Sequence, residues 1–384
     1  MHTLSVVGTR PNFVKMAPVL AQLYAQDPDG RHVLVHTGQH YDPLMSEIFF
    51  EELGVQEPTH RLEAGSGTHA VQTARVMERF EPILEEERPD VVLIPGDVNS
   101  TLSAAVVAAK ACIPLAHVES GLRSFDRTMP EEVNRVVADQ LSQFLFVHST
   151  EAVANLRAEG IPDERIHFVG NTMIDSLVAV GRRHRELDVQ SRIGLECDEY
   201  VLVTLHRPAL VDGPLLPAVV EQLNMLAAEL PVVFPMHPRT RARVEALGVR
   251  TRFHSLEPLG YLDFLSLQSC AAAVLTDSGG VQEETTYFGV PCFTLRDNTE
   301  RPVTVRSGTN TLLGLAPERI ADILPALESN TRATYPPPDG WDGRAAERLV
   351  GELGSGLVAT APGPEIAVSV QQAFEEEPPE AVAL

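Results

Sequence analysis

The sequence predicts an α/β protein of two Rossmann-like domains, each a doubly wound parallel sheet, that face one another across a cleft. Three observations support this fold class. The chain has 384 residues, which is too long for a single domain, since one domain usually contains about 150 residues. Short β-branched segments alternate with helical segments over the first half, and the same alternation begins again after residue 185. Such alternation requires a parallel sheet with helices on both faces.

The first predicted domain spans residues 1–170. Its strands are short β-branched runs that end in a turn with Gly, Asn or Asp, and its helices carry apolar residues at helical spacing. The predicted strands are Leu4–Val7, His32–His36, Val91–Ile94, Pro114–His117 and Phe144–His148. The predicted helices are Phe13–Tyr24, His69–Glu87, Ser100–Lys110, Pro130–Leu141 and Thr150–Glu159.

The second predicted domain spans residues 171–352, and the segment Gly170–Arg185 reads as a connecting helix where a hinge is expected. Its predicted strands are Tyr200–Leu205, Val232–Pro235, Ala272–Thr276 and Pro291–Leu295, and its helices Gly213–Leu230, Gly260–Ser269 and Gly279–Phe288. From residue 353 to residue 384 the chain is rich in Ala, Pro, Gly and Glu. We expect this acidic tail to be largely disordered.

Composition excludes several classes of protein. The net charge of −23 argues against nucleic acid and acidic membranes as partners. No apolar run approaches the roughly 20 residues that cross a bilayer, and the N-terminus reads as a strand rather than a secretory signal. We therefore expect a cytoplasmic location. The four cysteines are widely spaced without a CxxC pair, which favours reduced core thiols over disulfides or zinc ligands.

A basic strand-to-helix turn lies at residues 8–15. Pro11 suits the first helical position, so Arg10 on the loop and Lys15 one turn into the helix can both face an anion at the helix N-terminus. A surface turn with solvated charges is an equally good reading of this segment alone. The turn is not the GxGxxG dinucleotide fingerprint.

A second strand-to-helix turn contains two glycines, in Thr276–Glu284. Ser278, Gly279 and Gly280 offer exposed backbone N–H groups and a hydroxyl, which can hold a phosphate without a Walker lysine. Glu284 lies about one and a half helical turns further on, where its carboxylate can accept hydrogen bonds from ribose hydroxyls. A plain turn is the alternative, but a glycine pair costs chain entropy that a structural loop seldom requires.

Carboxylates cluster on the loops of the first domain. Asp97 and Glu119 each follow a strand directly, and ligands of such sheets bind beyond the carboxyl ends of the strands. Glu131 and Arg135 are four residues apart and share a helix face. Acids that converge near a phosphate site indicate acid–base catalysis, because one can be desolvated while another is held ionised by arginine. The alternative is that Asp97 caps the next helix and Glu131 complements a helix N-terminus.

The second domain places further polar residues at strand ends. His206 and His237 each follow a strand, and their spacing without HxxxH or CxxC argues against zinc and for phosphate contact or proton transfer. Arg301 follows the last strong strand and can reach the same cleft. Phe264 can be either helical core or one wall for a flat base.

Taken together, these segments resemble the non-hydrolysing UDP-N-acetylglucosamine 2-epimerases, from about Leu4 to Glu352. The motifs that carry the resemblance are GTRP at 8–11, KMAP at 15–18, GDVNSTL at 96–102, HVESGLRSFDRTMPEEVNR at 117–135, HR at 206–207, HPRT at 237–240, TDSGGVQEE at 276–284 and RDNTERP at 296–302. The resemblance implies the GT-B fold and inversion at sugar carbon 2 with no cofactor, neither nicotinamide nor metal. UDP would be eliminated to leave 2-acetamidoglucal and then added back on the other face.

The resemblance also implies roles for single residues. Those at catalytic positions are Asp97, Glu119, Glu131 and His206. Those at binding positions are Arg10, Lys15 and Arg135 near the phosphates, Ser278, Gly279 and Gly280 as the diphosphate cradle, Glu284 at the ribose, Phe264 beside uracil, and Arg301. The partner it implies is a UDP-N-acetylhexosamine substrate, and a homodimer is expected.

Several positions depart from the family pattern. Ala209 stands where the family has an acid after His206, Val303 follows TERP, and the segment at residues 39–41 reads Gln-His-Tyr. Other stretches are closer to epimerases of diacetamido uronic acid sugars. Three alternatives therefore stay open: a 2-epimerase of such a sugar, a GT-B glycosyltransferase, and an inactive UDP-sugar-binding regulator.

Overall fold

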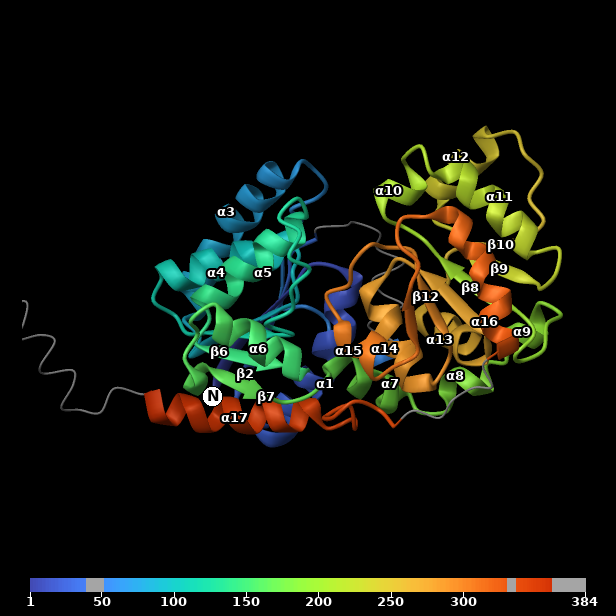
Figure 1. The fold of residues 1–384 in the computed structure, drawn as a ribbon. Helices are drawn as coiled ribbons and strands as arrows, with labels where there is room; N and C mark the ends of the chain where they lie inside the picture. Colours follow the sequence, from blue (N-terminus) through green and yellow to red (C-terminus); the bar gives the residue numbers. More distant parts are fainter. Residues whose placement is uncertain (39–51, 330–335, 361–384) are drawn as a thin grey trace, which may run out of the picture.

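The computed structural model describes residues 1–38, 52–329 and 336–360. Within these ranges the chain forms two parallel sheets that stand side by side with helices around and between them (Figure 1). The strand order is β3-β2-β1-β4-β5-β6-β7 in the seven-stranded sheet and β10-β9-β8-β11-β12-β13 in the six-stranded sheet. The structure thus confirms the predicted fold class of two doubly wound α/β sheets.

The first sheet and its helices come from the N-terminal half. The strands are β1 His2–Val7, β2 Arg31–His36, β3 His60–Arg61, β4 Val91–Pro95, β5 Leu115–Val118, β6 Phe144–Val147 and β7 Ile166–Phe168. The helices are α1 Arg10–Gln26, α3 His69–Glu87, α4 Asn99–Lys110, α5 Pro130–Leu141 and α6 Thr150–Ala158.

The second sheet follows a linker of three helices, α7 Thr172–Val180, α8 Arg183–Glu186 and α9 Val189–Arg192. Its strands are β8 Val201–Thr204, β9 Val232–Pro235, β10 His254–Leu256, β11 Ala273–Thr276, β12 Cys292–Thr294 and β13 Asn310–Leu312. The remaining helices are α10 Pro208–Val211, α11 Leu216–Leu226, α12 Pro238–Ala246, α13 Tyr261–Cys270, α14 Gly279–Phe288, α15 Pro302–Arg306, α16 Ile323–Ser329 and α17 Ala345–Thr360. No helix in the described ranges combines the length and apolarity that a membrane span needs.

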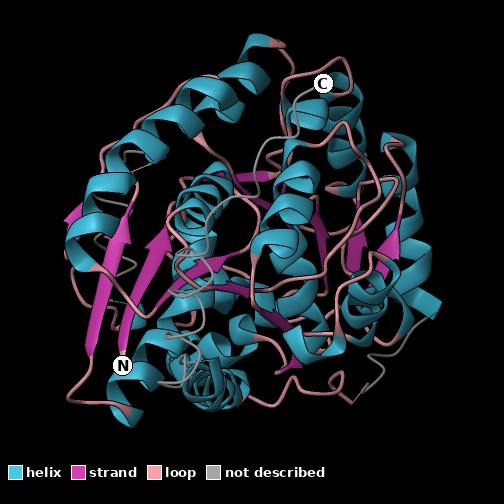
Figure 2. Cartoon of the chain, turned by 90° about the vertical axis from the view of Figure 1, so that its left-hand side faces the viewer, coloured by secondary structure: helices cyan, strands magenta, loops and turns pink. Residues whose placement is uncertain are grey.

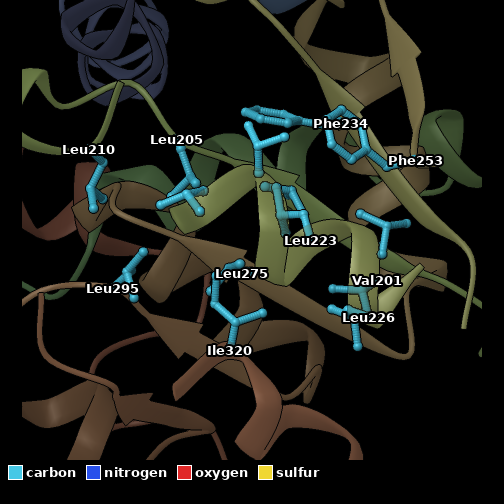
Figure 3. Packing of buried hydrophobic residues seen from close by; sticks show 14 of the residues in the cluster. Val201, Leu205, Leu210, Leu223, Leu226, Phe234, Phe253, Leu275, Leu295 and Ile320 are labelled. Atoms are coloured by element: carbon cyan, nitrogen blue, oxygen red, sulfur yellow. The ribbon is translucent and has the colours of Figure 1, made fainter. Parts of the chain in front are cut away.

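Helices cover both faces of each sheet, as the turned view in Figure 2 shows. Consecutive residues of a central strand therefore enter different cores: Val201 and Val203 pack on one face of the second sheet, and Leu202 packs on the other. Figure 3 shows the core of the first of these faces, where Leu223 and Phe234 are buried. Burial on both faces explains why the central strands are almost continuously apolar.

The main differences from the sequence prediction lie at the sheet edges and in the linker. The edge strands β3, β7, β10 and β13 contain only two or three residues each, too few for a recognisable pattern. The single connecting helix predicted at Gly170–Arg185 is broken into α7 and α8, because Gly181 adopts a left-handed backbone with φ of 53°.

Two crossings between the sheets can be followed in the described part of the chain. The first crossing runs through Gly170 into α7, and the second leads from Gly340 into α17, which lies beneath the first sheet (Figure 1). Leu349 and Leu353 of α17 join the core formed by α1 and the first sheet. Asp175 of α7 accepts hydrogen bonds from the first N–H groups of α17, so the crossings are tied together. The proposed boundaries at residues 170 and 352 remain predictions, and any hinge motion must involve both crossings.

Two further predictions concern the tail and the cysteines. Helix α17 continues to Thr360, into the segment predicted as a tail, and the rest of that segment lies outside the described residues. The prediction of reduced cysteines was wrong for Cys197 and Cys270, which form a disulfide with Cα atoms 4.6 Å apart. They are 73 residues apart in sequence, and the packing of α13 beside the start of β8 brings them together.

The close approach of the two crossings gives a test of the fold. Gly170 has φ of 93°, and a Cβ there would overlap the carbonyl oxygen of Gly340. Gly170→Ala should lower the free energy of unfolding by about 3 kcal/mol, through backbone strain and overlap together. Gly160→Ala is the matched control, because Gly160 has φ of 79° with open space around it, and it should cost about 1 kcal/mol. If urea titrations gave both variants the same loss in free energy of unfolding, the close approach of Gly170 to Gly340 would be contradicted.

Candidate active site

Two candidate acids stand at the carboxyl ends of neighbouring strands in the first sheet. Asp97 follows β4, and Glu119 follows β5, which pairs with β4. Glu119 has φ of 68°, a left-handed conformation that non-glycine residues rarely adopt outside functional sites. Its side chain is almost fully buried, whereas that of Asp97 is 24% exposed. The structure therefore brings these predicted acids to one edge, as parallel strands require.

Two cations hold the carboxylate of Glu119. Lys15 of α1 contacts one carboxylate oxygen, and Arg301, which precedes α15 in the second half of the chain, contacts the other. Burial favours the neutral acid, but Lys15 and Arg301 outweigh it and hold the pKa of Glu119 at about 2. Glu119 is thus an ionised group inside a charge cluster that joins the two sheets.

Asp97 is held by a third cation. Arg135 of α5 donates from Nε to Asp97 Oδ2 at 2.9 Å. The same guanidinium contacts Glu132, and its Nη2 lies 3.6 Å from Glu300. Asp97 does not cap the next helix, since the N-cap of α4 is Val98 and no side chain caps that end. Glu131 lies half-buried in the first turn of α5.

Helix α14 begins at the predicted phosphate cradle. Ser278 is its N-cap and makes no side-chain capping bond, so its hydroxyl does not occupy the first N–H groups of the helix. A Cβ at Gly279 would overlap the guanidinium of Arg301, which places this arginine beside the turn. Anions bind well at such helix N-termini. The side chain of Arg301 therefore lies next to both the cradle and Glu119.

His206 is fixed beside this turn by Asp277. The carboxylate of Asp277 accepts from the backbone N–H groups of His206 at 2.9 Å and Arg207 at 2.8 Å, and it lies 2.7 Å from His206 Nδ1. The surrounding protein atoms partly desolvate the imidazole and oppose its charge, but the hydrogen bond with Asp277 outweighs this and raises the pKa of His206. By solvent contact the side chain is 61% exposed, so it is accessible to a ligand.

Glu284 lies deeper along α14. Burial raises the pKa of its carboxyl to about 7, and the hydroxyl of Tyr261 is its main hydrogen-bonding partner. Arg10 reaches across from α1 and donates to the carbonyl oxygen of Leu259 at 3.1 Å, close to Tyr261. Phe264 is half-buried on α13 and packs against the core of the second sheet. The structure thus brings Glu284 close to Tyr261 of α13, and the core packing that the sequence left as an alternative for Phe264 is present.

Sequence reasoning missed the partners that complete the cluster. Arg301 Nε lies 3.1 Å from Glu283, which is also 3.3 Å from His148 Nε2. Arg296 donates to Glu300 at 2.6 Å and 2.9 Å. Both glutamates belong to quoted motifs. Glu283 pairs with His148, which is distant in sequence, so no local signal identified it, whereas the spacing of four residues between Arg296 and Glu300 was a local signal for that pair.

The cluster also contains a possible metal-ligand set. Ligand atoms of Glu119, His148 and Glu283 lie within 4.8 Å of one another. Lys15 and Arg301 already contact the carboxylates, so a divalent cation would be repelled by charges in place. The arrangement suits an anionic ligand better than a metal ion.

Comparison with known proteins agrees with this geometry. Two parallel Rossmann-like sheets with a shared polar edge define the GT-B fold, and the chain superposes on the crystal structure of Methanocaldococcus jannaschii UDP-GlcNAc 2-epimerase in complex with UDP-GlcNAc and UDP. The TM-score is 0.84 at 39% identity, with 92% of this chain and 100% of that chain covered.

Sequence relatives define the family. Residues 23–354 match the model of the UDP-N-acetylglucosamine 2-epimerase family. A UDP-N-acetylglucosamine 2-epimerase of Methanococcus maripaludis is 40% identical over 90% of this chain and 97% of its own length. The UDP-2,3-diacetamido-2,3-dideoxy-D-glucuronate 2-epimerase of Pseudomonas aeruginosa is 42% identical over 84% of this chain and 91% of its own. The chain belongs to the UDP-N-acetylglucosamine 2-epimerase family, whose members are isomerases.

The charge cluster predicts a large cost for removing its central cation. Arg301→Met leaves Glu119 and Glu283 buried with fewer counter-charges, so the free energy of unfolding should fall by about 3–5 kcal/mol. Arg306→Met is the matched control at the end of α15, the helix that Arg301 precedes: Arg306 is largely exposed and pairs with Glu151 at 3.2 Å, and its loss should cost under about 1 kcal/mol. Denaturant titrations that give the two variants equal stability would contradict the buried pairing.

Proposed function

We propose that this chain interconverts UDP-N-acetylglucosamine and UDP-N-acetylmannosamine by inversion at sugar carbon 2. One observation carries the proposal: Arg301 contacts Glu119 at the edge of the first sheet and lies beside the Gly279 turn of the second. A diphosphate at the turn would place its attached sugar near the carboxylates. The archaeal structure with UDP-GlcNAc and UDP bound supports a ligand of this class.

Different residues bind the diphosphate, the ribose and the uracil of the substrate. Backbone N–H groups from Ser278 to Gly280 hold the diphosphate, because a helix N-terminus favours negative charge. Glu284 accepts from ribose hydroxyls, and Phe264 borders the uracil. The cations that complete the diphosphate site are Arg10, Lys15, Arg135 and Arg301.

The chemical step needs no oxidant. A carboxylate takes the proton from C2, the C1–O bond breaks, and UDP leaves with the electron pair to give 2-acetamidoglucal. A second acid, on the opposite side of the sugar, then delivers its own proton to C2 while UDP adds back to C1, and the first carboxylate releases the original proton to solvent. Asp97, Glu119 and Glu131 supply the acid–base groups, and His206 supports charge on the departing UDP. Proton transfer by positioned side chains accounts for rate factors of about 10²–10⁴.

The resting charge state of Glu119 gives the site a way to respond to substrate. A carboxylate with a pKa of about 2 is a weak base. An arriving diphosphate competes for Lys15 and Arg301, which would loosen their hold on Glu119 and raise its pKa. Glu119 then becomes a better base only when substrate is present.

A related sugar is the second candidate substrate. The Pseudomonas aeruginosa relative, whose name specifies a 2,3-diacetamido glucuronate, is 42% identical to this chain. That sugar carries the same acetamido group at C2 and would undergo the same elimination.

We further propose that the protein is a homodimer and acts in the cytoplasm. Sedimentation equilibrium of the purified chain tests the dimer.

The reaction itself is tested by proton NMR of each nucleotide sugar with the purified protein and no acceptor. We expect the N-acetylmannosamine anomeric signal to appear from UDP-N-acetylglucosamine, at an unchanged rate in EDTA. Conversion of only the diacetamido uronate would shift the assignment to the second candidate. Loss of turnover on chelation, restored by a divalent ion, would contradict the metal-free mechanism.

Single substitutions should separate chemistry from binding. Glu119→Gln should lower turnover by about 100-fold or more without weakening UDP binding, because the carboxylate acts in proton transfer and its charge no longer competes with the diphosphate for Lys15 and Arg301. Glu284→Ala is the matched comparison and should weaken UDP binding while the bound substrate still turns over. Isothermal calorimetry measures the UDP affinity, and initial rates measure the turnover. If Glu119→Gln failed to bind UDP, Glu119 would be needed for binding and could not be a proton-transfer group only.

A further inference from the structure

Three charged residues near the candidate acids have no part in the proposed reaction. His117 and Arg123 flank Glu119 in the sequence, and Asp139 reaches them from α5. His117 and Asp139 are 0% exposed and Arg123 is 3% exposed. Charged groups so deeply buried are costly unless each is paired and hydrogen-bonded.

Both ring nitrogens of His117 face oxygen acceptors. Nδ1 lies 2.6 Å from Asp139 Oδ1, and Nε2 lies 2.7 Å from the carbonyl oxygen of Gly96. A carbonyl oxygen cannot donate, so Nε2 must carry a proton. If Nδ1 carried none, Asp139 would have to donate instead.

Asp139 has further partners besides His117. Its Oδ2 lies 2.7 Å from Arg123 Nη2 and accepts from the N–H of Gly121 at 3.1 Å. Burial favours the neutral acid, but His117 and Arg123 outweigh it and lower the pKa of Asp139. The other charged groups nearby are Glu159, which follows α6 and pairs with Arg123, and Arg165, which donates to the backbone of α5. Asp139 is therefore an acceptor for the loop that follows β5.

This buried pair fixes both loops that carry candidate acids. The carbonyl oxygen that His117 holds belongs to Gly96, the residue before Asp97. Asp139 accepts a hydrogen bond from the N–H of Gly121, two residues after Glu119. Glu119 itself has a left-handed backbone, and such a conformation persists only when its surroundings stabilise it. Asp139 therefore connects the loop after β4 to the loop after β5.

We propose that the buried pair of His117 and Asp139 positions Asp97 and Glu119 relative to each other. Both are positioning residues, since they act through the backbone of Gly96 and Gly121. The effect on catalysis rests on the proposed function, whereas the hydrogen bonds that fix the two loops do not.

Nitrogen NMR of the histidine-labelled protein tests the hydrogen bond to Gly96 directly. We expect Nε2 of the His117 ring to carry a proton, because its partner is a carbonyl oxygen that can only accept. The ring signals disappear in His117→Gln, and they can be identified in the wild type by contacts with Leu145, the neighbour of His117 across β5 and β6. A ring whose Nε2 carries no proton would overturn the proposal, even if the enzyme epimerises UDP-sugars as proposed.

Kinetics test the positioning. His117→Gln and Asp139→Asn should each lower kcat by about 100-fold, because a shift of about 1 Å in a catalytic group has that effect, while calorimetric UDP affinity stays near wild type. Ser142→Ala is the matched control: Ser142 is equally buried after α5, but its hydroxyl bonds only to the carbonyl of Ala138. Its kcat should not change. Unchanged kcat in both site variants, or UDP binding lost together with kcat, would refute positioning.

Discussion

The contact between Arg301 and Glu119 is the interaction on which the rest of the site depends. It joins the two sheets through side chains that are both more than nine-tenths buried. Removing two charges from water is costly, and only close pairing compensates for it. Lys15, Glu283 and Glu300 complete that pairing, so the acids of one domain and the anion site of the other are held in one charge network.

The fold supplies the geometry for this network. In each doubly wound sheet the loops that follow the strands gather at one edge, and two such sheets side by side bring two edges together. The acids come from the loops after β4 and β5, and the cradle comes from the loop after β11. Neither sheet alone could hold both ends of a nucleotide sugar. The second crossing, which returns α17 to the first sheet, limits how far the two can separate.

Much of this arrangement could be predicted from the sequence, and the remainder could not for physical reasons. The buried central strands are apolar and β-branched, so their positions were predicted within a few residues, whereas β3 contains two residues and left no pattern. Asp97 and Glu119 were recognisable because they follow strands. The partners of Glu119 were not, since Arg301 is 182 residues away and the contact depends on how the domains pack. The disulfide between Cys197 and Cys270 was missed for the same reason.

The central claim is that cations hold Glu119 ionised until a diphosphate competes for them. Carbon NMR of the glutamate carboxyl groups, with Glu119→Gln to identify the signal, measures this directly. In the ligand-free protein the Glu119 signal should keep its ionised shift as the pH falls through 4.5, the ordinary pKa of a glutamate, because its own pKa is about 2. Saturating UDP should move its titration to higher pH. An identical titration with and without UDP, or a ligand-free pKa near the ordinary value of 4.5, would contradict the account.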